Sequence, residues 1–527
     1  MEIELRGTSI IGSTRGAESD NGFRAFNPRT GEAVEPHFYS ASNVNLETAA
    51  DLASAARIPF ANTSGASRAR LLDLIAGNIE KLGDRLIERA SLETGLSAAR
   101  LTGERARTCG QLRSFARLLL EGSWVDARID HAIPDRQLFP KPDIRSMFRP
   151  IGPVAVFCAS NFPLAYSVAG GDTASALAAG CPVIVNAHSA HPGTAELTGN
   201  AVAAAVRECE MPEGVFSLLF SAGYEIGQTL VGHPEIKGVG FTGSRRGGRA
   251  LMDIASARPE PIPVYAEMSS VNPTFILNNA IDERGEDIAR ALHRSVTNDA
   301  GQFCTKPGLV FIESGEQTED FVRQFRSLIA ETHTFPLLTA GIQKSYLQTS
   351  GRRRQKVNTF IEADNTELNG FSVRPAVFET STEQFLSTDD LNDEIFGPAT
   401  LLIRSNDHEE ILAAARALEG QLTASIHGTE ADLAAYSDLI SVLETKVGRL
   451  IFNGFSTGVE VCPSMVHGGP YPATSDGRST AVGTRAIERF SRLVCYQNFP
   501  EASLPDELKE ANPLGIRRMI DGRVENS

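Results

Sequence analysis

This sequence of 527 residues has no long apolar run, no disulfide framework and no excess of positive charge. A membrane-spanning helix needs about 18 or more consecutive apolar residues, and the first residues, MEIELRGTSIIGSTRG, hold no continuous apolar segment of a secretion signal. The seven cysteines are an odd number spread over a long chain, so we expect them to be reduced and the protein to be cytoplasmic. The formal net charge of −15 disfavours nucleic acid and anionic membranes, and we expect no metal ion either.

The chain is long and 42% hydrophobic, which predicts two to three domains with sizeable cores. Residues 45–121 predict successive amphipathic helices, for example over 66–82, because apolar residues recur at spacings of three and four. Residues 131–150 contain four prolines and alternate in polarity, so we expect a linker or an edge-strand excursion that forms an oligomerisation arm. The tail near 490–500 is expected to return to this arm and form a small sheet with it.

From residue 153 onward, short apolar segments alternate with helical segments rich in small residues. PVAVFCAS, PVIVNA, VFSLLF and IKGVGFTG are the predicted strands, and this alternation is typical of βαβ units with a parallel sheet. A dinucleotide is expected at the carboxyl ends of such strands. Beyond about residue 268, PTFIL and LVFIE alternate with further helices and predict a second α/β lobe that reaches about residue 485. The basic segment 351–358 is expected to be a solvated loop.

Cys304 is the candidate nucleophile, because it lies in the small and polar segment NDAGQFCTKPG. Most cysteines are inert buried residues. A reactive thiol needs a turn or helix start whose backbone N–H groups favour the thiolate, and this segment is compatible with one.

Glu267 and Asn161 are the next candidates. Glu267 ends the apolar run PVYAE, where it is either a salt-bridged strand-end residue or a general base whose pKa burial raises towards working pH. Asn161 follows a predicted strand and is either a helix cap or an amide that donates to an oxyanion. Gly243 and Ser244 connect a strand to a helix, where free N–H groups suit a pyrophosphate, although the motif is not GxGxxG.

Five segments share an order and spacing with one known family. NFP at 161–163, FTGS at 241–244, the glutamate of AEMSS, the cysteine of GQFCTKPG and EIFGPA at 394–399 together resemble the aldehyde dehydrogenase superfamily. The resemblance implies a Rossmann-type cofactor domain, an α/β catalytic domain and a small oligomerisation arm. The corresponding boundaries are 1–130 and 151–266 for the cofactor domain, 131–150 for the arm, 267–485 for the catalytic domain and 486–527 for the C-terminal oligomerisation segment.

The resemblance also implies roles for particular residues. Cys304 is similar to the family nucleophile, Glu267 to the base that activates water, and Asn161 with the Cys304 backbone N–H to the oxyanion hole. Glu394 and Phe396 match the residues that hold the nicotinamide ribose and pack on its ring. Ser244 likewise matches the contact with the pyrophosphate.

The segments VIVNAHSAHPGTAE, RPEPIPVYAEMSSVNPTFIL and VHGGPYPATSD are most similar to a bacterial branch of this superfamily. That branch contains α-ketoglutaric semialdehyde (2,5-dioxopentanoate) dehydrogenases and NADP-dependent fatty aldehyde dehydrogenases, which leaves both substrates open. At two cofactor positions the chain departs from the usual family pattern. Asn186 replaces a lysine that attracts a 2′-phosphate, and Ser189 replaces an acidic residue that repels it. The expected cofactor is NAD or NADP, and NADP is favoured.

The expected substrate pocket consists of residues around the candidate nucleophile: Phe162, Tyr166, Gln302, Phe303 and Phe455. A keto-acid substrate also needs an arginine or a group of N–H donors, which the sequence does not identify. A cysteine hydrolase would need a histidine near the thiol, and the ten histidines give no local sign of one. A non-catalytic binding protein is the other alternative, and a homodimer or homotetramer is expected.

Overall fold

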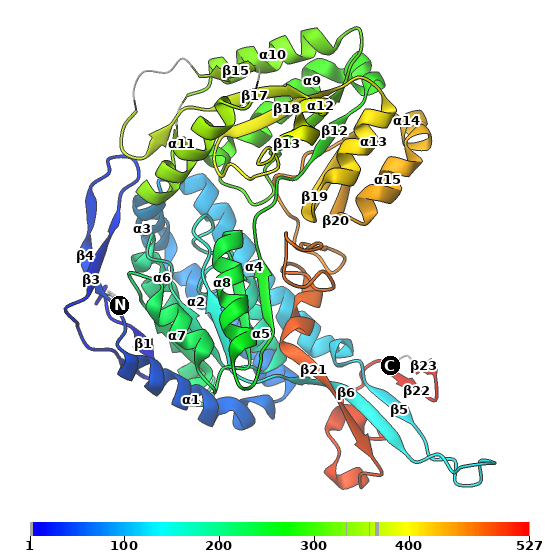
Figure 1. Cartoon of the computed structure of the whole chain (residues 1–527). Coiled ribbons are helices and arrows are strands. Elements are labelled where there is room, and N and C mark those ends of the chain that lie inside the picture. Colours follow the sequence, from blue (N-terminus) through cyan, green and yellow to red (C-terminus); the bar gives the residue numbers. More distant parts are fainter. Residues whose placement is uncertain (1–3, 334, 358, 364–367, 526–527) are drawn as a thin grey trace.

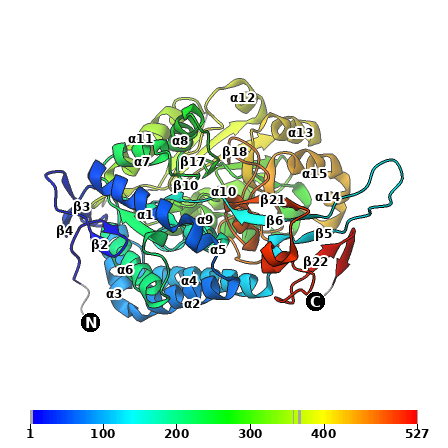
Figure 2. The same cartoon turned by 90° about the horizontal axis from the view of Figure 1, so that it is seen from below.

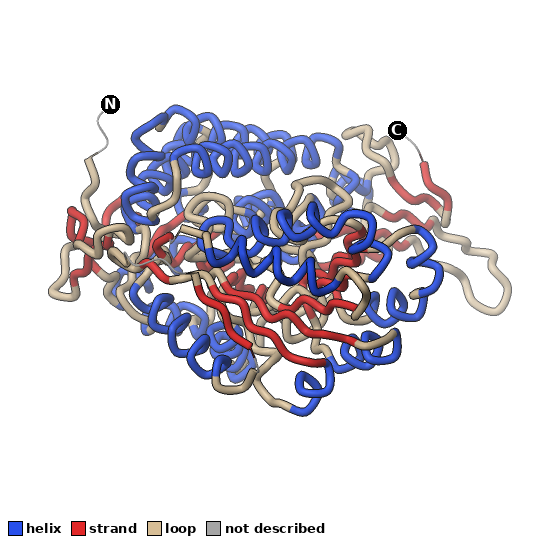
Figure 3. Tube along the Cα trace, turned by 90° about the horizontal axis from the view of Figure 1, so that it is seen from above, coloured by secondary structure: helices blue, strands red, loops and turns tan. Residues whose placement is uncertain are grey.

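Two seven-stranded sheets form the cores of two lobes (Figure 1). This computed structural model describes residues 4–333, 335–357, 359–363 and 368–525. In Figure 1 the N-terminal lobe lies below and the later lobe lies above it. Seen from above in Figure 3, the strands run through the middle of the molecule and helices lie on both sides of them. The α/β class expected from the sequence is confirmed.

The first sheet has the strand order β11-β10-β7-β8-β9-β1-β2. Its parallel strands are those predicted from the short apolar runs: β7 (Val154–Phe157), β8 (Val183–Asn186), β9 (Phe216–Leu219), β10 (Gly238–Thr242) and β11 (Val264–Glu267). Strands covered by helices on both faces bury every side chain, which explains why β7 is apolar without alternation and why all four residues of β9, including Ser217, are buried. The sequence did not predict β1 (Ile10–Ile11) and β2 (Thr14–Arg15), which add an antiparallel edge next to β9.

The helices around this sheet include those predicted over 45–121. They are α1 (Asn43–Ala61), α2 (Gly65–Lys81), α3 (Gly83–Thr94), α4 (Ala98–Glu121), α5 (Gly171–Ala179), α6 (Pro192–Glu208), α7 (Glu225–Gly232) and α8 (Arg245–Ala257). Serine side chains cap α1, α2, α4 and α8 by accepting a backbone N–H of the first turn. Gly95 and Gly122 end α3 and α4 with φ of 70° and 80°, a conformation that favours glycine.

The second sheet has the order β15-β17-β18-β13-β12-β19-β20. Its strands are β12 (Thr274–Ile276), β13 (Leu309–Glu313), β15 (Thr359–Glu362), β17 (Ala376–Ser381), β18 (Ala399–Ser405), β19 (Gln421–His427) and β20 (Val447–Phe452). All neighbours are parallel except β15, which pairs antiparallel with β17. The covering helices are α9 (Asn278–Thr297), α10 (Thr318–Ala330), α11 (Ala340–Arg354), α12 (Thr382–Ser387), α13 (His408–Ala417), α14 (Glu430–Ala435) and α15 (Ser437–Glu444).

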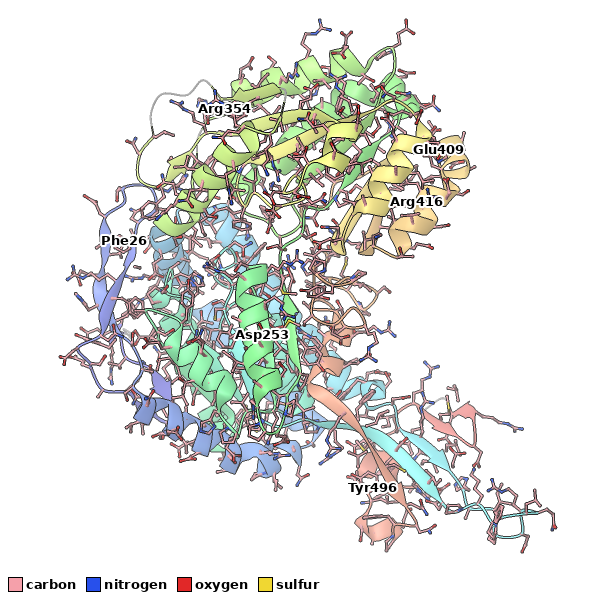
Figure 4. The ribbon with its side chains drawn as sticks, viewed as in Figure 1. Phe26, Asp253, Arg354, Glu409, Arg416 and Tyr496 are labelled. Atoms are coloured by element: carbon pink, nitrogen blue, oxygen red, sulfur yellow. The ribbon has the colours of Figure 1, made fainter. Side chains whose placement is uncertain are left out.

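A separate five-stranded sheet forms an arm with the order β21-β6-β5-β22-β23. Its strands are β5 (Arg128–Asp130), β6 (Ile144–Pro150), β21 (Ser491–Gln497), β22 (Arg518–Ile520) and β23 (Arg523–Glu525). The tail therefore returns to the proline-rich segment as predicted, since β21 pairs antiparallel with β6 along its whole length. The segment between β5 and β6 projects from the body in Figure 2, and Tyr496 marks β21 in Figure 4.

The prediction of a solvated basic loop at 351–358 is wrong for part of this segment. Residues 351–354 form the last turns of α11, and Arg353 is buried there, donating to the backbone carbonyls of Asp390 and Asp393. Three arginines in the last turn suit the negative end of the helix dipole. Arg354 is labelled in Figure 4, and Asn358 lies outside the described residues.

Two short sheets complete the described fold. They are the hairpin of β3 (Gly22–Phe26) and β4 (Ala33–Tyr39), and the pair of β14 (Phe335–Pro336) and β16 (Ser372–Val373). Within the described ranges, no helix is long and apolar enough to cross a membrane.

Candidate active site

One cavity of about 230 Å³ brings together seven of the residues that the sequence singled out. They come from both lobes and are Asn161, Gly243, Ser244, Glu267, Cys304, Glu394 and Phe396. Glu267 ends β11, Gly243 and Ser244 connect β10 to α8, and Asn161 follows β7, so one half of the cavity lies at the carboxyl ends of parallel strands. Cys304, Glu394 and Phe396 come from the second lobe.

The backbone before Cys304 follows a strained path. Asp299, Ala300 and Gly301 all have positive φ, at 45°, 56° and 65°. A Cβ atom at Gly301 would lie 2.4 Å from the carbonyl oxygen of Gly397, so only glycine fits there. The carboxylate of Asp299 is held by the guanidinium of Arg100 at 2.9 Å, which fixes the turn that leads to Cys304.

Asn161 holds the same turn from the other lobe. Its Nδ2 donates to the backbone carbonyl of Gln302 at 2.8 Å, two residues before Cys304. An amide nitrogen carries two hydrogens, so the second remains available to an oxygen atom in the cavity. The Gln302 side chain is itself occupied, because it donates to the Asp299 carbonyl and accepts from the Leu338 N–H.

The sequence did not identify His467, which lies between Cys304 and Glu267. Its Nε2 is 3.7 Å from Sγ of Cys304 and 3.0 Å from Oε2 of Glu267. One ligand atom from each of the three residues lies within 4.8 Å of the others. His467 stands 163 residues after Cys304 in the segment VHGGPYPATSD, and the only signal it gave was its place in that motif. The ten histidines show no local sequence sign of such a contact, yet the fold brings His467 next to the thiol.

The surroundings shift the pKa values of Cys304 and Glu267 in opposite directions. Burial raises the pKa of the Cys304 thiol well above its ordinary value, and the carboxylate of Glu267 raises it further, whereas the positive charge of Arg107 opposes both. The resting sulfur is thus a thiol. The sequence of this segment is compatible with a turn that favours a thiolate, but burial and the Glu267 carboxylate favour the thiol in the resting site.

Of the two alternatives for Glu267, its contact with His467 supports the salt-bridged strand-end residue, and its pKa is not raised. Burial alone would raise it, but the contact with His467 and the thiol of Cys304 together hold the pKa of this carboxyl below its ordinary value. Its side chain is only 3% exposed, so the carboxylate depends on His467 for stabilisation.

Glu394 and Lys306 form a second buried charged group beside the cavity. Burial raises the pKa of Glu394 and lowers the pKa of Lys306, while each charge favours the ionised form of the other. The Nζ of Lys306 also donates to the carbonyl of Ala399. Glu394 is thereby presented to the cavity as an acceptor for hydroxyl groups.

The N-terminus of α8 offers groups that suit a phosphate. Ser244 caps the helix by accepting the N–H of Gly247 at 3.2 Å, and both Gly243 and Ser244 are exposed in the cavity wall. The first-turn N–H groups and the helix dipole favour an anion at this end. A helix N-terminus, a carboxylate and the Phe396 ring around one cavity fit the phosphates, ribose and ring of a dinucleotide. Arg245 points elsewhere, because it pairs with Glu419 at 2.8 Å.

The remaining predicted residues divide between four places. Phe162 and Phe303 pack together with Tyr166 beside them, and the ring of Tyr166 lies 6.3 Å from that of His467. Gln302 and Phe455 line a different cavity of about 660 Å³. Ser189 lines a cavity of about 400 Å³ next to the β3–β4 hairpin, and Asn186 ends β8, where its side chain accepts from the Ser221 hydroxyl.

Comparison with known proteins gives a match to the profile of the aldehyde dehydrogenase family over residues 15–492. The chain belongs to this family. It is 48% identical to "Alpha-ketoglutaric semialdehyde dehydrogenase 2" of Azospirillum brasilense, over 99% of this chain and 100% of that protein. It is 43% identical to the "Alpha-ketoglutaric semialdehyde dehydrogenase" of Acinetobacter baylyi, over 98% of this chain and 99% of that one.

Solved structures support the fold at lower identity. A 1-pyrroline-5-carboxylate dehydrogenase from Thermus with bound NAD matches with a TM-score of 0.78 and 20% identity, over 93% of this chain and 92% of that chain. PnpE from Pseudomonas sp. WBC-3 also matches with a TM-score of 0.78 and 20% identity, over 94% of this chain and 97% of that chain. The fold is therefore that of the NAD(P)-dependent aldehyde dehydrogenases.

Proposed function

We propose that this protein oxidises α-ketoglutaric semialdehyde to 2-oxoglutarate with NAD(P)⁺, through a thioester on Cys304. The observation that carries the chemistry is the cluster of Cys304, His467 and Glu267. Cys304 and Glu267 line a cavity that also reaches the α8 N-terminus and Glu394. The substrate assignment is supported by the names of two relatives that are 48% and 43% identical along nearly their whole length.

In the first step Sγ of Cys304 attacks the aldehyde carbon and loses its proton. Glu267 is the acceptor, because one of its carboxylate oxygens lies within 4.8 Å of Sγ and His467, 3.0 Å from that carboxylate, keeps it ionised. Because the pKa of Cys304 is raised, proton transfer and attack occur together. The oxyanion of the thiohemiacetal accepts hydrogen bonds from Nδ2 of Asn161 and from the backbone N–H of Cys304.

The cofactor, when bound, takes up the hydride that leaves the thiohemiacetal carbon. The chain would position it from both lobes: the N–H groups around Gly243 and Ser244 would hold the pyrophosphate, the Glu394 carboxylate would accept from the nicotinamide ribose, and Phe396 would pack on the ring. These contacts would bring the hydride acceptor into the same cavity as Cys304.

Hydrolysis of the thioester completes the reaction. Glu267 accepts a proton from the water that attacks the thioester carbon, and the same two donors hold the new oxyanion. The lowered pKa keeps Glu267 ionised at neutral pH, so the base is ready once the thioester has formed. Release of the carboxylic acid returns Sγ to its protonated form.

For the choice of cofactor, we favour NADP. The residues that line the cavity at Ser189 include Arg24 and no acidic side chain, so nothing in this lining repels a 2′-phosphate. Neutral Asn186 neither attracts nor repels it. The buried His188 does not supply a charge, because burial lowers its pKa to about 3.

The experiment compares kcat/KM for α-ketoglutaric semialdehyde and a long-chain aldehyde, each with NAD and with NADP, by the absorbance of the reduced nicotinamide. We expect the semialdehyde with NADP to give the highest value. A higher value for the long-chain aldehyde would assign the chain to fatty aldehyde oxidation. No reduction with any aldehyde, while the dinucleotide still binds, would favour the non-catalytic alternative.

We further propose a cytoplasmic homodimer or homotetramer built through the arm. All seven cysteines are free, in keeping with a reducing compartment. The arm strand β21 lies at the edge of its sheet with Leu493 58% exposed, and an unpaired strand edge invites association with another chain. Light scattering tests this, and a monomer would contradict it.

A further inference from the structure

A guanidinium group that has no role in the proposed mechanism lies against the aromatic cluster of Phe162, Tyr166 and Phe303. Arg107 lies on α4 and donates from Nη2 to the Tyr166 hydroxyl at 3.0 Å. Its guanidinium carbon also lies 5.4 Å from the centre of the Tyr166 ring and 5.9 Å from that of Phe162. Tyr166 in turn lies next to His467, so Arg107 is separated from the reacting sulfur by only two side chains.

Helix α4 holds Arg107 in this place. One turn earlier, the buried carboxylate of Glu104 accepts the N–H groups of Leu164 and Ala165, both at 2.8 Å, which fastens the helix to the segment after Asn161. Residues three and four apart share one face of a helix. The same face that carries Glu104 therefore directs Arg107 at Tyr166.

A second guanidinium group approaches from the other lobe. Arg449 lies on β20 and donates to the carbonyls of Ser456 at 2.7 Å and Gly458 at 3.1 Å. The Ser456 hydroxyl donates to the carbonyl of Thr305, the residue after Cys304. Arg449 is thus anchored to the loop that contacts the nucleophile segment.

These two arginines differ from their neighbours in having no carboxylate partner. Arg100, two turns before Arg107 on α4, is paired with both Glu104 and Asp299. Among the residues that the structure describes, neither Arg107 nor Arg449 takes part in an ion pair, and the Nε of each is buried without a hydrogen-bond partner. In a protein with 65 acidic residues against 50 basic ones, two half-buried guanidinium groups left without a carboxylate fit an anionic ligand.

We propose that Arg107, assisted by Arg449, binds the carboxylate of the substrate and so selects aldehydes that carry a carboxylate at the far end of a short chain. This inference rests on the proposed function. In α-ketoglutaric semialdehyde three carbons separate the carboxylate from the aldehyde carbon, so the charge lies at the far end of a short chain from the reacting group. A guanidinium group is the side chain best adapted to bind a carboxylate through two hydrogen bonds.

The experiment compares glutaric semialdehyde with pentanal, which has the same chain length and no charge, in the wild type, Arg107→Met and Arg449→Met. We expect the ratio of kcat/KM for the semialdehyde to that for pentanal to fall roughly ten- to a hundredfold in Arg107→Met, the range that a charge-assisted hydrogen bond provides. The fall in Arg449→Met should be smaller. Arg107→Lys keeps the positive charge but cannot bind a carboxylate through two hydrogen bonds of one planar group, so its ratio should lie between those of Arg107→Met and the wild type.

Arg117→Met is the matched control, because it removes a positive charge from the exposed side of the same helix. Its ratio should equal that of the wild type. A second measurement does not require turnover: 2-oxoglutarate should slow alkylation of Cys304 by iodoacetamide in the wild type and should protect less in Arg107→Met. Because alkylation does not require turnover, this measurement detects carboxylate binding even in an Arg107 variant that has lost activity.

The outcomes separate the inference from the proposed function. A wild type that oxidises pentanal at least as well as glutaric semialdehyde, or an Arg107→Met variant that lowers both values equally, would overturn the inference and leave aldehyde oxidation standing. A wild type that oxidises neither aldehyde with either cofactor, while 2-oxoglutarate still protects Cys304, would overturn the proposed function instead.

Discussion

Replacing His467 by glutamine removes the group that keeps Glu267 ionised. In the wild type, Nε2 of His467 lies 3.0 Å from the carboxylate and the pKa of Glu267 is lowered despite burial. A hydrogen bond to a charged group contributes about 1.5–3 kcal/mol, and about 1.4 kcal/mol corresponds to one pH unit. We therefore expect the acid limb of kcat to move about one to two pH units higher in the variant, because Glu267 must be ionised to activate water.

The same substitution should change how stability depends on pH. In the wild type the lowered pKa means that Glu267 stabilises the fold above the pKa of an unfolded glutamate, and this contribution is lost as pH falls through the lowered pKa. Without His467, burial dominates and raises the pKa, so the variant loses stability as pH rises towards that value. The gap between the two proteins should thus be small near pH 4 and reach roughly 3 kcal/mol at pH 8.

The assay measures kcat from pH 5 to 9 and the thermal unfolding midpoint at both ends of this range. His408→Gln is the control, since His408 also pairs with a carboxylate, Asp438 at 2.9 Å, but on the surface. It should change neither profile. Two results together would refute the assignment of the low Glu267 pKa to His467. The acid limb of the kcat–pH profile would be the same in His467→Gln as in the wild type, and the difference in their unfolding midpoints would not grow with pH.

Three further substitutions test separate parts of the site. Glu267→Gln should lower steady-state turnover by roughly 10²–10⁴-fold and should also slow the burst of reduced cofactor in stopped-flow absorbance. An unchanged burst would show that Glu267 acts only in hydrolysis. Ser189→Glu should lower kcat/KM with NADP more than with NAD, because a carboxylate repels the 2′-phosphate, and an equal change with both would place the 2′-phosphate elsewhere. Gly301→Ala should lower both the thermal unfolding midpoint and the rate of Cys304 alkylation. The reason is that φ of Gly301 is 65° and the added Cβ would lie 2.4 Å from the Gly397 carbonyl oxygen. A variant as stable and as reactive as the wild type would show that the turn relaxes freely.

The sequence by itself determined the local elements and the chemistry-bearing residues. Buried parallel strands are short apolar runs, and the helices between them repeat with a period of 3.6, so β7 to β10 and the helices over 45–121 could be predicted from composition and spacing. Cys304, Glu267, Glu394 and Phe396 stand in motifs whose order the family shares, and the structure brings all four to one cavity.

The tertiary structure alone decided what surrounds these residues. His467 and Cys304 are 163 residues apart in the sequence, so their contact depends on the packing of distant segments and cannot be predicted from local hydrophobic periodicity. The pKa values of Cys304 and Glu267 follow from burial and from charges on other elements, so their direction could not be predicted from the strand-end position. The place of Arg107 likewise depends on which face of α4 meets the Tyr166 segment. Sequence periodicity tells which face of an element is buried, whereas the partner that buries it, and hence the electrostatics of the site, is set only when distant segments pack together.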